Sequence, residues 1–537
     1  MRNSSLSLVA ASGAVVSELG HPCLRGLDDL FQPLDTLLAS GGDDRLTVAP
    51  GSRLNMYGCA GAPRTEAIEL SSSTASSISA PALERLCRAR EQIIERGTID
   101  GFDDALDQHI EHSRESLRIY LGLSGSGAEV VFSPSGTDSQ LHALFLAEAV
   151  LGGPLTTVVV GADQTGSGTA FTARGRHFNR RTGMGKAVIK GAPLCDYPNA
   201  FAAVDVPFAT STGAWHSLSE IDDCVTCAVE EEIRKGRKVL LQAMHASKFG
   251  LRGPSDACLE ELCSRWPNDV LVVVDACQAR IGRAKTRRYL DRGYALLVTG
   301  SKFYMGPPFS GALLVPKRLS AFIAAGSFSL GALNAYLDRS CLPSGWRRLR
   351  GQFALVPNPG QWLRWEAALE EMRLYDMLPL PFRSAVMSRL QTSIPDLITT
   401  SKHLMPLALP AELMPRDAAD EEFVSATIFP FLIRTNDTYA PLNWAKALCE
   451  TLNVADGALG RHGAGDDIGR PCHIGQPVAL PLPGGIETAA PRICVGARNL
   501  FEAWSTGADP VEAAVQAILQ DVDVAVRQLD RLAERLS

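Results

Sequence analysis

The chain has 537 residues, of which 46% are hydrophobic and 21% are charged, and its formal net charge is −7. This length and apolar content support a large core, arranged as two to four domains or as one large α/β enzyme domain with a smaller partner. The negative charge argues against nucleic acid as a partner, and no apolar run approaches the length needed to span a membrane.

The N-terminal residues and the spacing of the cysteines indicate the cellular compartment in which the protein is expected. The first 20 residues contain one positive residue, Arg2, and a weak apolar stretch, so we interpret them as a flexible or packing arm rather than a signal peptide. The 13 cysteines lack the spacing of a disulfide framework, which a chain of this length does not need, and a reducing cytoplasm is expected. Cys224 and Cys227 form a single CVTC pair with no second pair, and no metal site is predicted.

Regular structure is expected to begin after an N-terminal arm and lead-in segment at residues 1–70, which mix Gly, Pro and polar residues. A helix is predicted from Ser79 to about Gly97, since Ser is a good N-cap, Pro81 is tolerated in the first turn and Gly often ends a helix. A second helix is predicted over about 103–121 from apolar residues at helical spacing.

A strand, a turn and a helix are predicted in succession over residues 129–150. The turn, Ser133-Pro134-Ser135-Gly136-Thr137, puts small residues with free amides and hydroxyls at the N-terminus of an apolar helix. Outward-pointing amides and the helix dipole favour an anion at such a position. The turn is interpreted either as an anion site or as an ordinary helix cap.

Short β-branched runs bounded by turn residues predict the buried strands of a mostly parallel sheet. They lie at residues 129–132, 157–160, 239–243, 270–274, 294–298 and 311–315. A helix is predicted over 220–235, and the basic, Gly-rich stretch 171–190 is expected to be a mobile surface loop without chemistry. These elements are expected to form a large domain over residues 71–350.

The C-terminal part of the chain predicts a smaller α+β domain over residues 351–537, after an Arg/Gly/Pro-rich boundary at 344–360. The Gly/Pro/His-rich stretch 456–487 is expected to hold few regular elements. The other expected elements are a helix, two strand-like runs and a long terminal helix, at 361–376, 423–434 and 511–536.

Asp275 and Lys302 are the first candidates for catalysis. Asp275 ends the strand 270–274, and Lys302 follows the strand 294–298 inside a Ser/Gly/Pro loop. Ligands of open α/β sheets bind at such strand ends. Pyridoxal phosphate (PLP) needs a lysine amine for its Schiff base and an Asp that keeps its pyridine nitrogen protonated, so that the ring can accept the electrons of a carbanion. Taken singly, a strand-capping Asp and a solvated Lys are the alternative interpretation.

Four segments together resemble the class V aminotransferase and cysteine desulfurase group of fold-type I PLP-dependent enzymes, from about residue 68 to the C-terminus. The segments are FSPSGTDSQ at 132–140, DACQ at 275–278, TGSKFYMGPP at 299–308 and PRICVGARN at 491–499. Their order and the separation of Asp275 and Lys302 are similar to those of the family. The resemblance implies an α/β fold with a large PLP-binding domain of mostly parallel sheet and a smaller α+β C-terminal domain. It also implies a homodimer, because family sites form at the subunit interface.

The resemblance assigns a role to each matching residue. Lys302 would form the Schiff base and then act as general acid or base, and Asp275 would pair with the ring nitrogen. Gln278 would bond the ring oxygen, and Arg492 would bind the substrate carboxylate through a bidentate fork. The implied phosphate ligands are Ser135, Gly136, Thr137, Thr299 and Ser301.

Several positions depart from the family pattern. Where the family stacks a His on the cofactor ring, this sequence has Gln164 followed by Thr165. Ser301 stands where the desulfurases usually have His, and Ser247, in the segment MHASKFGLRGP, takes the place of a polar cofactor contact. His245 in the same segment is either an acid–base or ring-stacking group or a satisfied strand-end histidine.

These residues leave three functions open. An aminotransferase of an amino acid or amino-bearing metabolite is the first, a cysteine desulfurase or C–S/β-lyase is the second, and a non-catalytic PLP-fold protein is the third. Desulfuration needs a mobile thiol, and Cys472, which precedes Arg492, is the candidate nucleophile. Its neighbour His473 would contact the substrate or a neighbouring subunit. The insertions near 171–235 and 380–460 would shape the substrate pocket.

Overall fold

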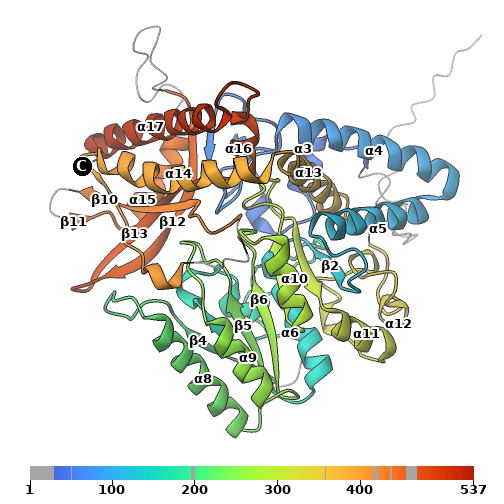
Figure 1. Cartoon of the computed structure of the whole chain (residues 1–537). Coiled ribbons are helices and arrows are strands. Elements are labelled where there is room, and N and C mark those ends of the chain that lie inside the picture. Colours follow the sequence, from blue (N-terminus) through green and yellow to red (C-terminus); the bar gives the residue numbers. More distant parts are fainter. Residues whose placement is uncertain are drawn as a thin grey trace, which may run out of the picture.

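The computed structural model describes residues 30–49, 51–194, 200–356, 358–414, 420, 422–435, 438–454 and 469–536. These residues form two β-sheets with helices packed around them (Figure 1). One sheet comes from the middle of the chain, and the other comes mainly from its C-terminal part.

The larger sheet has seven strands in the order β2-β8-β7-β6-β5-β3-β4. The run from β4 through β3, β5 and β6 to β7 is parallel, and β8 lies antiparallel between β7 and β2. The strands are β2 Glu129–Ser133, β3 Leu155–Val160, β4 Phe201–Val206, β5 Lys238–Met244, β6 Val270–Asp275, β7 Ala295–Thr299 and β8 Gly311–Val315. The expected strands of a mostly parallel sheet are therefore confirmed.

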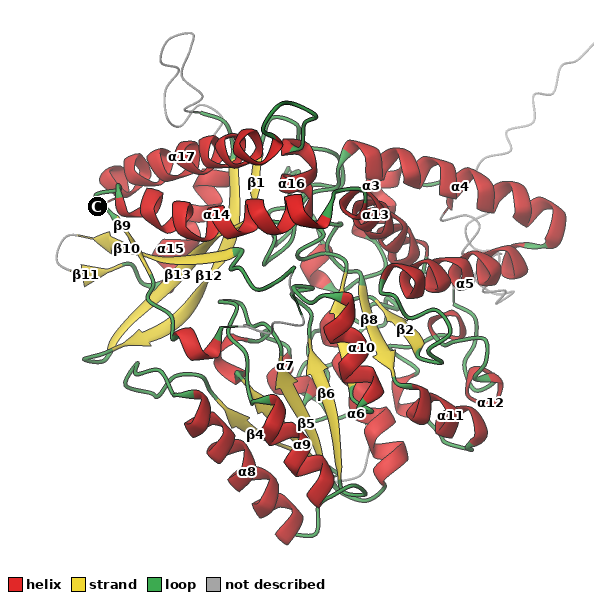
Figure 2. Ribbon diagram, viewed as in Figure 1, coloured by secondary structure: helices red, strands yellow, loops and turns green. Residues whose placement is uncertain are grey.

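Helices cover both faces of this sheet (Figure 2), which explains why its strands are apolar along most of their length. Successive strand residues point to opposite faces. Val131 and Val273 pack in one core cluster with α6, and their neighbours Val130 and Val272 pack in the other with α8 and α9. The helices beside the sheet are α6 Gly136–Leu151, α7 Thr169–Thr172, α8 Leu218–Arg234, α9 Asp256–Arg265, α10 Arg283–Asp291, α11 Lys317–Ala325 and α12 Arg347–Arg350.

A layer of helices lies next to the larger sheet and reaches the second one (Figure 1). Helix α13 packs against α3, α4, α5 and α16, and almost all of its described side chains are buried. A helix that is buried on every side belongs to the core rather than to a surface layer. The bounds are α3 Leu34–Ala39, α4 Ala80–Asp100, α5 Phe102–Tyr120, α13 Pro359–Asp376 and α16 Ala497–Ala503.

The second sheet has the order β1-β12-β13-β10-β11, with β9 paired to β10. Strand β1, from the N-terminal part of the chain, pairs parallel with β12, and the other pairs are antiparallel. Helices α14, α15 and α17 pack beside it. The bounds are β1 Ile68–Leu70, β9 Leu404–Pro406, β10 Ile428–Thr435, β11 Thr438–Tyr439, β12 Cys472–Leu482, β13 Ile486–Cys494, α14 Leu380–Thr399, α15 Leu442–Asn453 and α17 Pro510–Leu536.

The predicted fold class is confirmed, because a large domain with a mostly parallel sheet is followed by a smaller α+β unit. The expectation of few regular elements in 456–487 is wrong for its described residues, since β12 occupies Cys472–Leu482. Prolines weaken a strand signal, and the pairing of β12 with β13 shifts register beside Pro477, between Gly475 and Val478.

Two other expectations need correction. The stretch 171–190 is not only a surface loop, because Phe178 and Thr182 are buried. The lead-in segment 1–70 contains regular elements in its described part, namely α3, a short 3-10 helix at Asp44–Leu46 and β1. None of the described helices is both long and apolar enough to cross a membrane.

Candidate active site

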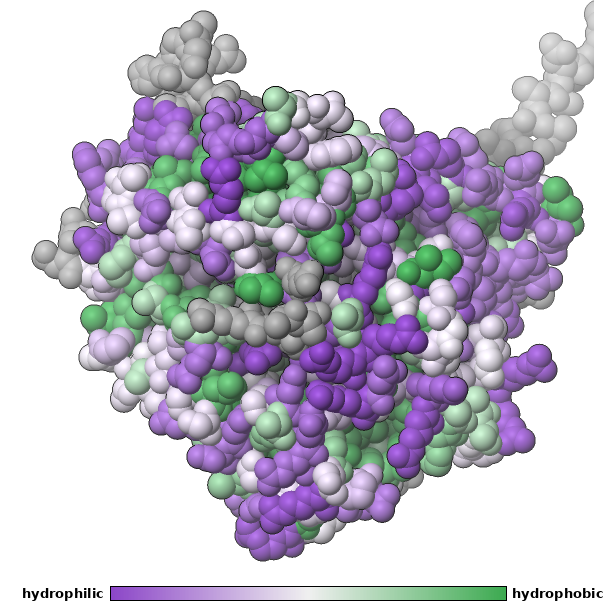
Figure 3. All heavy atoms as spheres, in the orientation of Figure 1, coloured by the Kyte–Doolittle hydropathy of each residue, from purple (hydrophilic) through white to green (hydrophobic). Residues whose placement is uncertain are grey.

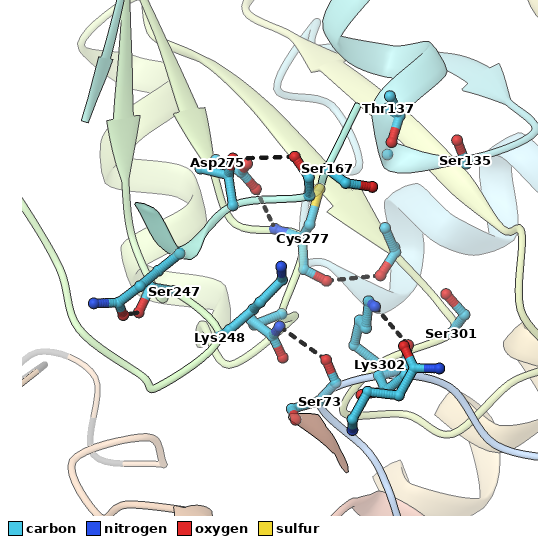
Figure 4. A pocket seen from close by; sticks show the side chains of 18 of the residues that line it. Ser73, Ser135, Thr137, Ser167, Ser247, Lys248, Asp275, Cys277, Ser301 and Lys302 are labelled. Atoms are coloured by element: carbon cyan, nitrogen blue, oxygen red, sulfur yellow. Dashed lines mark hydrogen bonds between the residues drawn. The ribbon is translucent and has the colours of Figure 1, made fainter. Parts of the chain in front are cut away.

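A cavity of about 220 Å³ lies at the carboxyl ends of β5, β6 and β7 (Figure 4). Its walls come from the loops of the larger sheet, from the N-terminal segment around Ser73 and Thr74, and from β12 and β13 of the second sheet. The residues predicted from sequence that line it are Ser135, Gly136, Thr137, Gln164, Ser247, Asp275, Gln278, Thr299, Ser301, Lys302 and Arg492. Four motifs that are far apart in the sequence therefore meet in one cavity.

Asp275 is the last residue of β6, and only 6% of it is exposed. The backbone N–H of Cys277 donates to its Oδ1 at 3.1 Å, and Gln242 Nε2 donates to its Oδ2 at 3.4 Å. Burial raises the pKa of Asp275, and among the described residues no cation forms an ion pair with it. A buried carboxylate with neutral partners favours a cationic ligand group beside it.

Lys302 follows β7 and extends into the same cavity (Figure 4). Its Nζ donates to the backbone oxygen of Thr74 at 2.5 Å. Burial, and then the positive charge of Arg492, lower the pKa of Lys302 to about 8. A larger fraction of this amine is therefore neutral near pH 7 than in an exposed lysine, and a neutral amine can act as nucleophile or base.

Strained backbone surrounds Lys302. Among the described residues, the non-glycine residues with a left-handed φ are Ala279 at 55°, Met305 at 61° and Phe309 at 74°. All three lie in the loops that follow β6 and β7, where Asp275 and Lys302 are. Such conformations cost on the order of 1–3 kcal/mol each and persist where the surrounding structure imposes them, often at functional sites.

The N-terminus of α6 forms another wall of the cavity. Ser135 is its N-cap and accepts a hydrogen bond from the backbone N–H of Asp138 at 3.3 Å. A Cβ on Gly136 would lie 2.7 Å from Cys277 Sγ, and one on Gly311 would lie 2.4 Å from the backbone of Ser135. Glycine at these two positions therefore lets the helix start approach both β8 and the loop after Asp275.

Arg45 supplies a positive charge at this helix start and was not predicted from the sequence. Its Nη2 lies 3.3 Å from Ser135 Oγ, and its Nη1 lies 3.5 Å from Thr137 Oγ1. The guanidinium stacks 4.8 Å from the ring centre of Phe309 and pairs with Asp43. An arginine beside a helix N-terminus strengthens an anion site. No motif around Arg45 distinguishes it in the sequence from the other arginines.

Amide and hydroxyl side chains occupy the wall next to Asp275. Ser247 Oγ donates to Gln164 Oε1 at 2.6 Å, and Gln278 Nε2 donates to the backbone oxygen of Ser73 at 3.1 Å. Thr299 Oγ1 donates to the backbone oxygen of Cys277 at 2.7 Å. Of these predicted groups, Ser247 and Gln164 thus bond each other, whereas Gln278 and Thr299 bond backbone oxygens. Thr165 and Gln140 also line the cavity.

His245 is a buried strand-end residue with its own partners. Its ring nitrogens lie 3.2 Å from the Arg280 backbone oxygen and 3.3 Å from the Tyr289 hydroxyl. Burial lowers the pKa of His245 to about 4. It is not among the described residues that line the cavity, so the interpretation as a satisfied strand-end histidine holds.

Arg492 is 2% exposed and reaches the cavity from β13. Its Nη1 donates to the Lys248 backbone oxygen at 3.2 Å, and its Nη2 donates to Thr74 Oγ1 at 2.9 Å and to the Gln476 backbone oxygen at 2.7 Å. All of these acceptors are neutral. A second missed residue, Lys248, lines the cavity beside it and directly follows the predicted contact Ser247.

Cys472 and His473 are not among the described residues that line the cavity. The Cys472 thiol is fully buried and lies 3.5 Å from the Arg470 backbone oxygen, and burial raises its pKa to about 12. His473 bonds Glu69 Oε2 at 2.9 Å and the Tyr57 backbone oxygen at 2.8 Å. Burial would raise the pKa of Glu69, but His473 lowers it to about 2. His473 thus connects β12 to the N-terminal segment.

Comparison with known proteins gave matches among solved structures. No protein-family model matches the chain, and no curated protein does. A cysteine desulfurase of Thermococcus onnurineus is 15% identical with a TM-score of 0.46, over 85% of this chain and 94% of that one. The cysteine desulfurase CsdA of Escherichia coli is 14% identical with a TM-score of 0.47, over 88% and 96%. A TDC of Oryza sativa with PLP and tryptamine is 14% identical with a TM-score of 0.46, over 98% and 90%.

Proposed function

We propose that this chain is a PLP-dependent enzyme that acts on an amino acid or amino-bearing metabolite through Lys302, and that its reaction is transamination. One observation carries the proposal. Asp275 and Lys302, at the ends of the adjacent strands β6 and β7, share one cavity with the anion site at the start of α6. A carboxylate, an amine and an anion site together are what PLP requires of a protein.

The described residues fit PLP at three points. The Asp275 carboxylate is buried with neutral partners, and a protonated pyridine nitrogen would balance its charge. Ser135, Thr137 and Arg45 offer a helix N-terminus, two hydroxyls and a guanidinium to a phosphate. Lys302 offers an amine that is partly neutral near pH 7 because its pKa is lowered to about 8.

When bound, PLP supplies an aldehyde carbon that condenses with amines and a protonated ring that accepts the electron pair of the substrate's α-carbon. Asp275 would keep the proton on the ring nitrogen. Lys302 Nζ would take the α-proton as a neutral amine and, as an ammonium, would deliver a proton to the former aldehyde carbon of the cofactor, which is the transfer that transamination requires; its pKa of about 8 suits both roles near neutral pH. The Arg492 guanidinium, held by Thr74 and Gln476, would bind the α-carboxylate.

Transamination is preferred to desulfuration because of where the thiols lie. The candidate nucleophile Cys472 is buried outside the cavity. Cys277 does line the cavity, but its Sγ packs against Gly136, and burial followed by the charge of Asp275 raises its pKa well above the ordinary value. Protonated thiols held in this way are poor nucleophiles. The non-catalytic alternative leaves the lowered pKa of Lys302 without a use.

The visible spectrum of the purified protein, reconstituted with PLP, tests the cofactor and the lysine together. We expect an absorption band of the cofactor–lysine linkage that Lys302→Ala removes. Lys248→Ala is the matched control, because Lys248 lines the same cavity and should leave the band in place. The absence of a band in the wild-type protein would contradict the proposal.

The reaction type is tested in a single turnover without a second substrate. An aminotransferase should lose its visible band on mixing with an amino donor and release about one equivalent of keto acid per site. Release of alanine from cysteine in many turnovers, with sulfide set free from the transferred sulfur by an added thiol reductant, would instead favour the desulfurase. In that case a loss of activity in Cys472→Ser would restore the prediction for this thiol.

A further inference from the structure

We propose that Lys248 and Arg492 form a subsite for two anionic groups, so that the substrate is an amino compound with a second carboxylate, sulfonate or phosphate beyond its α-carboxylate. This inference rests on the proposed PLP-dependent function and specifies its substrate class. It begins with Lys248, which lines the cavity directly after Ser247 and was assigned no role by the sequence.

The backbone of Lys248 is fixed by the site itself. Its N–H donates to the Gln164 backbone oxygen at 3.4 Å, and its carbonyl oxygen accepts from Arg492 Nη1 at 3.2 Å. The side chain, in contrast, forms no hydrogen bond or ion pair with any residue in the part of the chain that the structure describes. Figure 4 shows its ammonium end directed into the cavity that Asp275 and Lys302 share. A well-anchored lysine with a free ammonium group inside a cavity is suited to an anionic ligand.

Like Lys248, Arg492 carries a positive charge that no carboxylate of the described residues neutralises. Its hydrogen bonds go to two backbone oxygens and one hydroxyl, and its Nε has no partner among the described residues although it is buried. Burying a guanidinium without a counter-charge is costly unless a ligand supplies one. One carboxylate of the substrate would satisfy Arg492 but would leave Lys248 unpaired.

The count of charged side chains around the cavity supports a second anionic group on the substrate. Asp275 is the one carboxylate among the described residues that line it, and the proposed cofactor ring nitrogen would engage that carboxylate. Arg45 is already paired with Asp43 at the phosphate end. Lys248 and Arg492 thus remain as two cations next to each other, where an amino acid with one carboxylate can balance only one.

The electrostatics of the cavity agree with this interpretation. Burial, followed by the charges of Arg492 and Lys302, lowers the pKa of Lys248 to about 7, while the negative charge of Asp163 acts in the opposite direction. An anion bound beside Lys248 would favour its charged form again. Arg280, which donates to the cavity residue Gln278, is a further buried guanidinium with neutral oxygen partners, and burial lowers its pKa to about 10.

Calorimetric titration of the PLP-loaded protein with unreactive acids tests the subsite without relying on turnover. The probes are the dicarboxylates malonate, succinate, glutarate and adipate, each compared with the monocarboxylate of equal length. We expect one dicarboxylate to bind at least about tenfold more tightly than its monocarboxylate partner, because a second charge-assisted contact is gained. Lys248→Met should remove this preference, and Lys248→Arg should keep most of it.

Lys402→Met is the matched control, since it removes the same charge from an exposed site between α14 and β9. Equal binding of di- and monocarboxylates to the wild-type protein would overturn the subsite, whether or not the Lys248 variants fold. A dicarboxylate preference that survives in Lys248→Met would also overturn it. Both outcomes assume that the visible band of PLP has formed, and a wild-type protein without that band would contradict the proposed function instead.

Discussion

Asp275 is the residue whose replacement separates cofactor binding from catalysis. Asp275→Asn keeps the size of the side chain but removes the negative charge that would hold a proton on the ring nitrogen. PLP should still bind, because Lys302 and the phosphate contacts remain, while kcat should fall by at least about 100-fold. Spectral titration with PLP and keto acid release measure the two effects.

Asp269→Asn is the control for this substitution, because Asp269 lies just before β6, at the end of the strand opposite Asp275, and pairs with Lys238 on the surface. It should leave both PLP affinity and kcat close to the wild-type values. If Asp275→Asn kept a wild-type kcat, Asp275 would not act on the ring nitrogen.

The pKa of Lys302 gives a second prediction at the scale of single residues. After burial, the charge of Arg492 is the next cause of its lowering to about 8. Removing that charge in Arg492→Gln should raise the pKa of Lys302, so a smaller fraction of the amine is neutral at pH 7.5. The rate at which the apoprotein captures PLP should therefore rise with pH in both proteins, with a midpoint at higher pH in the variant. Arg492→Lys, which keeps the charge, should leave the midpoint near its wild-type position, and an unchanged midpoint in Arg492→Gln would refute this coupling.

At the scale of elements, the start of α6 combines two roles that substitution can separate. Ser135 caps the helix and also faces the cavity beside Arg45. Ser217 caps α8 through a capping box and does not line the cavity among the described residues. Ser135→Ala and Ser217→Ala should each destabilise the protein by about 0.5–2 kcal/mol. Only Ser135→Ala should also weaken PLP binding, by about tenfold, as measured by spectral titration. Equal PLP affinities in the two variants would mean that α6 holds no phosphate.

The elements also show what local sequence could predict. The strands of the larger sheet were recognisable because burial on both faces makes them apolar throughout, and the turn before α6 was recognisable from its small residues. Strand β12 was missed because Pro477 interrupts its pattern and because its neighbour β1 lies about 400 residues earlier in the chain. Register between such distant segments is set by tertiary packing, which no local window contains.

The same limit applies to the site. Asp275, Lys302 and Arg492 could be located because each belongs to a segment with a recognisable family pattern. Arg45 and Lys248 could not be located in this way, because only the fold brings these charged residues to the cavity. The expected roles of Cys472 and His473 followed from sequence proximity to Arg492, but these two residues lie at the start of β12, where it pairs with β1, whereas residues further along β12, Gln476 to Val478, line the cavity.

At the scale of the whole molecule, the cavity depends on contacts between parts of the chain that are far apart. Thr74 from the N-terminal segment accepts from both Lys302, through its backbone oxygen, and Arg492, through its hydroxyl. The three predicted domains and the homodimer stay predictions, and sedimentation equilibrium of the PLP-loaded protein would measure the number of subunits. The residues that join the parts inside one subunit are already visible in the structure.

A buried ion pair between Arg498 on α16 and Glu371 on α13 is one of these connections. Arg498 Nη2 donates to Glu371 Oε1 at 2.6 Å and to the backbone oxygen of Met305 at 2.5 Å, and its Nη1 donates to the Ser77 backbone oxygen at 3.0 Å. The pair thus links the second sheet's helices, the loop of Lys302 and the segment that leads into α4.

Glu371→Gln should leave a buried guanidinium without its counter-charge and lower the free energy of unfolding by about 3–5 kcal/mol, measured as a shift in the urea midpoint. It should also weaken PLP binding, because Met305 lies in the loop that positions Lys302. Asp523→Asn breaks the half-exposed pair with Arg527 and should cost less than about 1 kcal/mol, with no change in PLP affinity. If both variants shifted the urea midpoint equally, the Arg498–Glu371 pair would be dispensable and the Lys302 loop would be held by its packing alone.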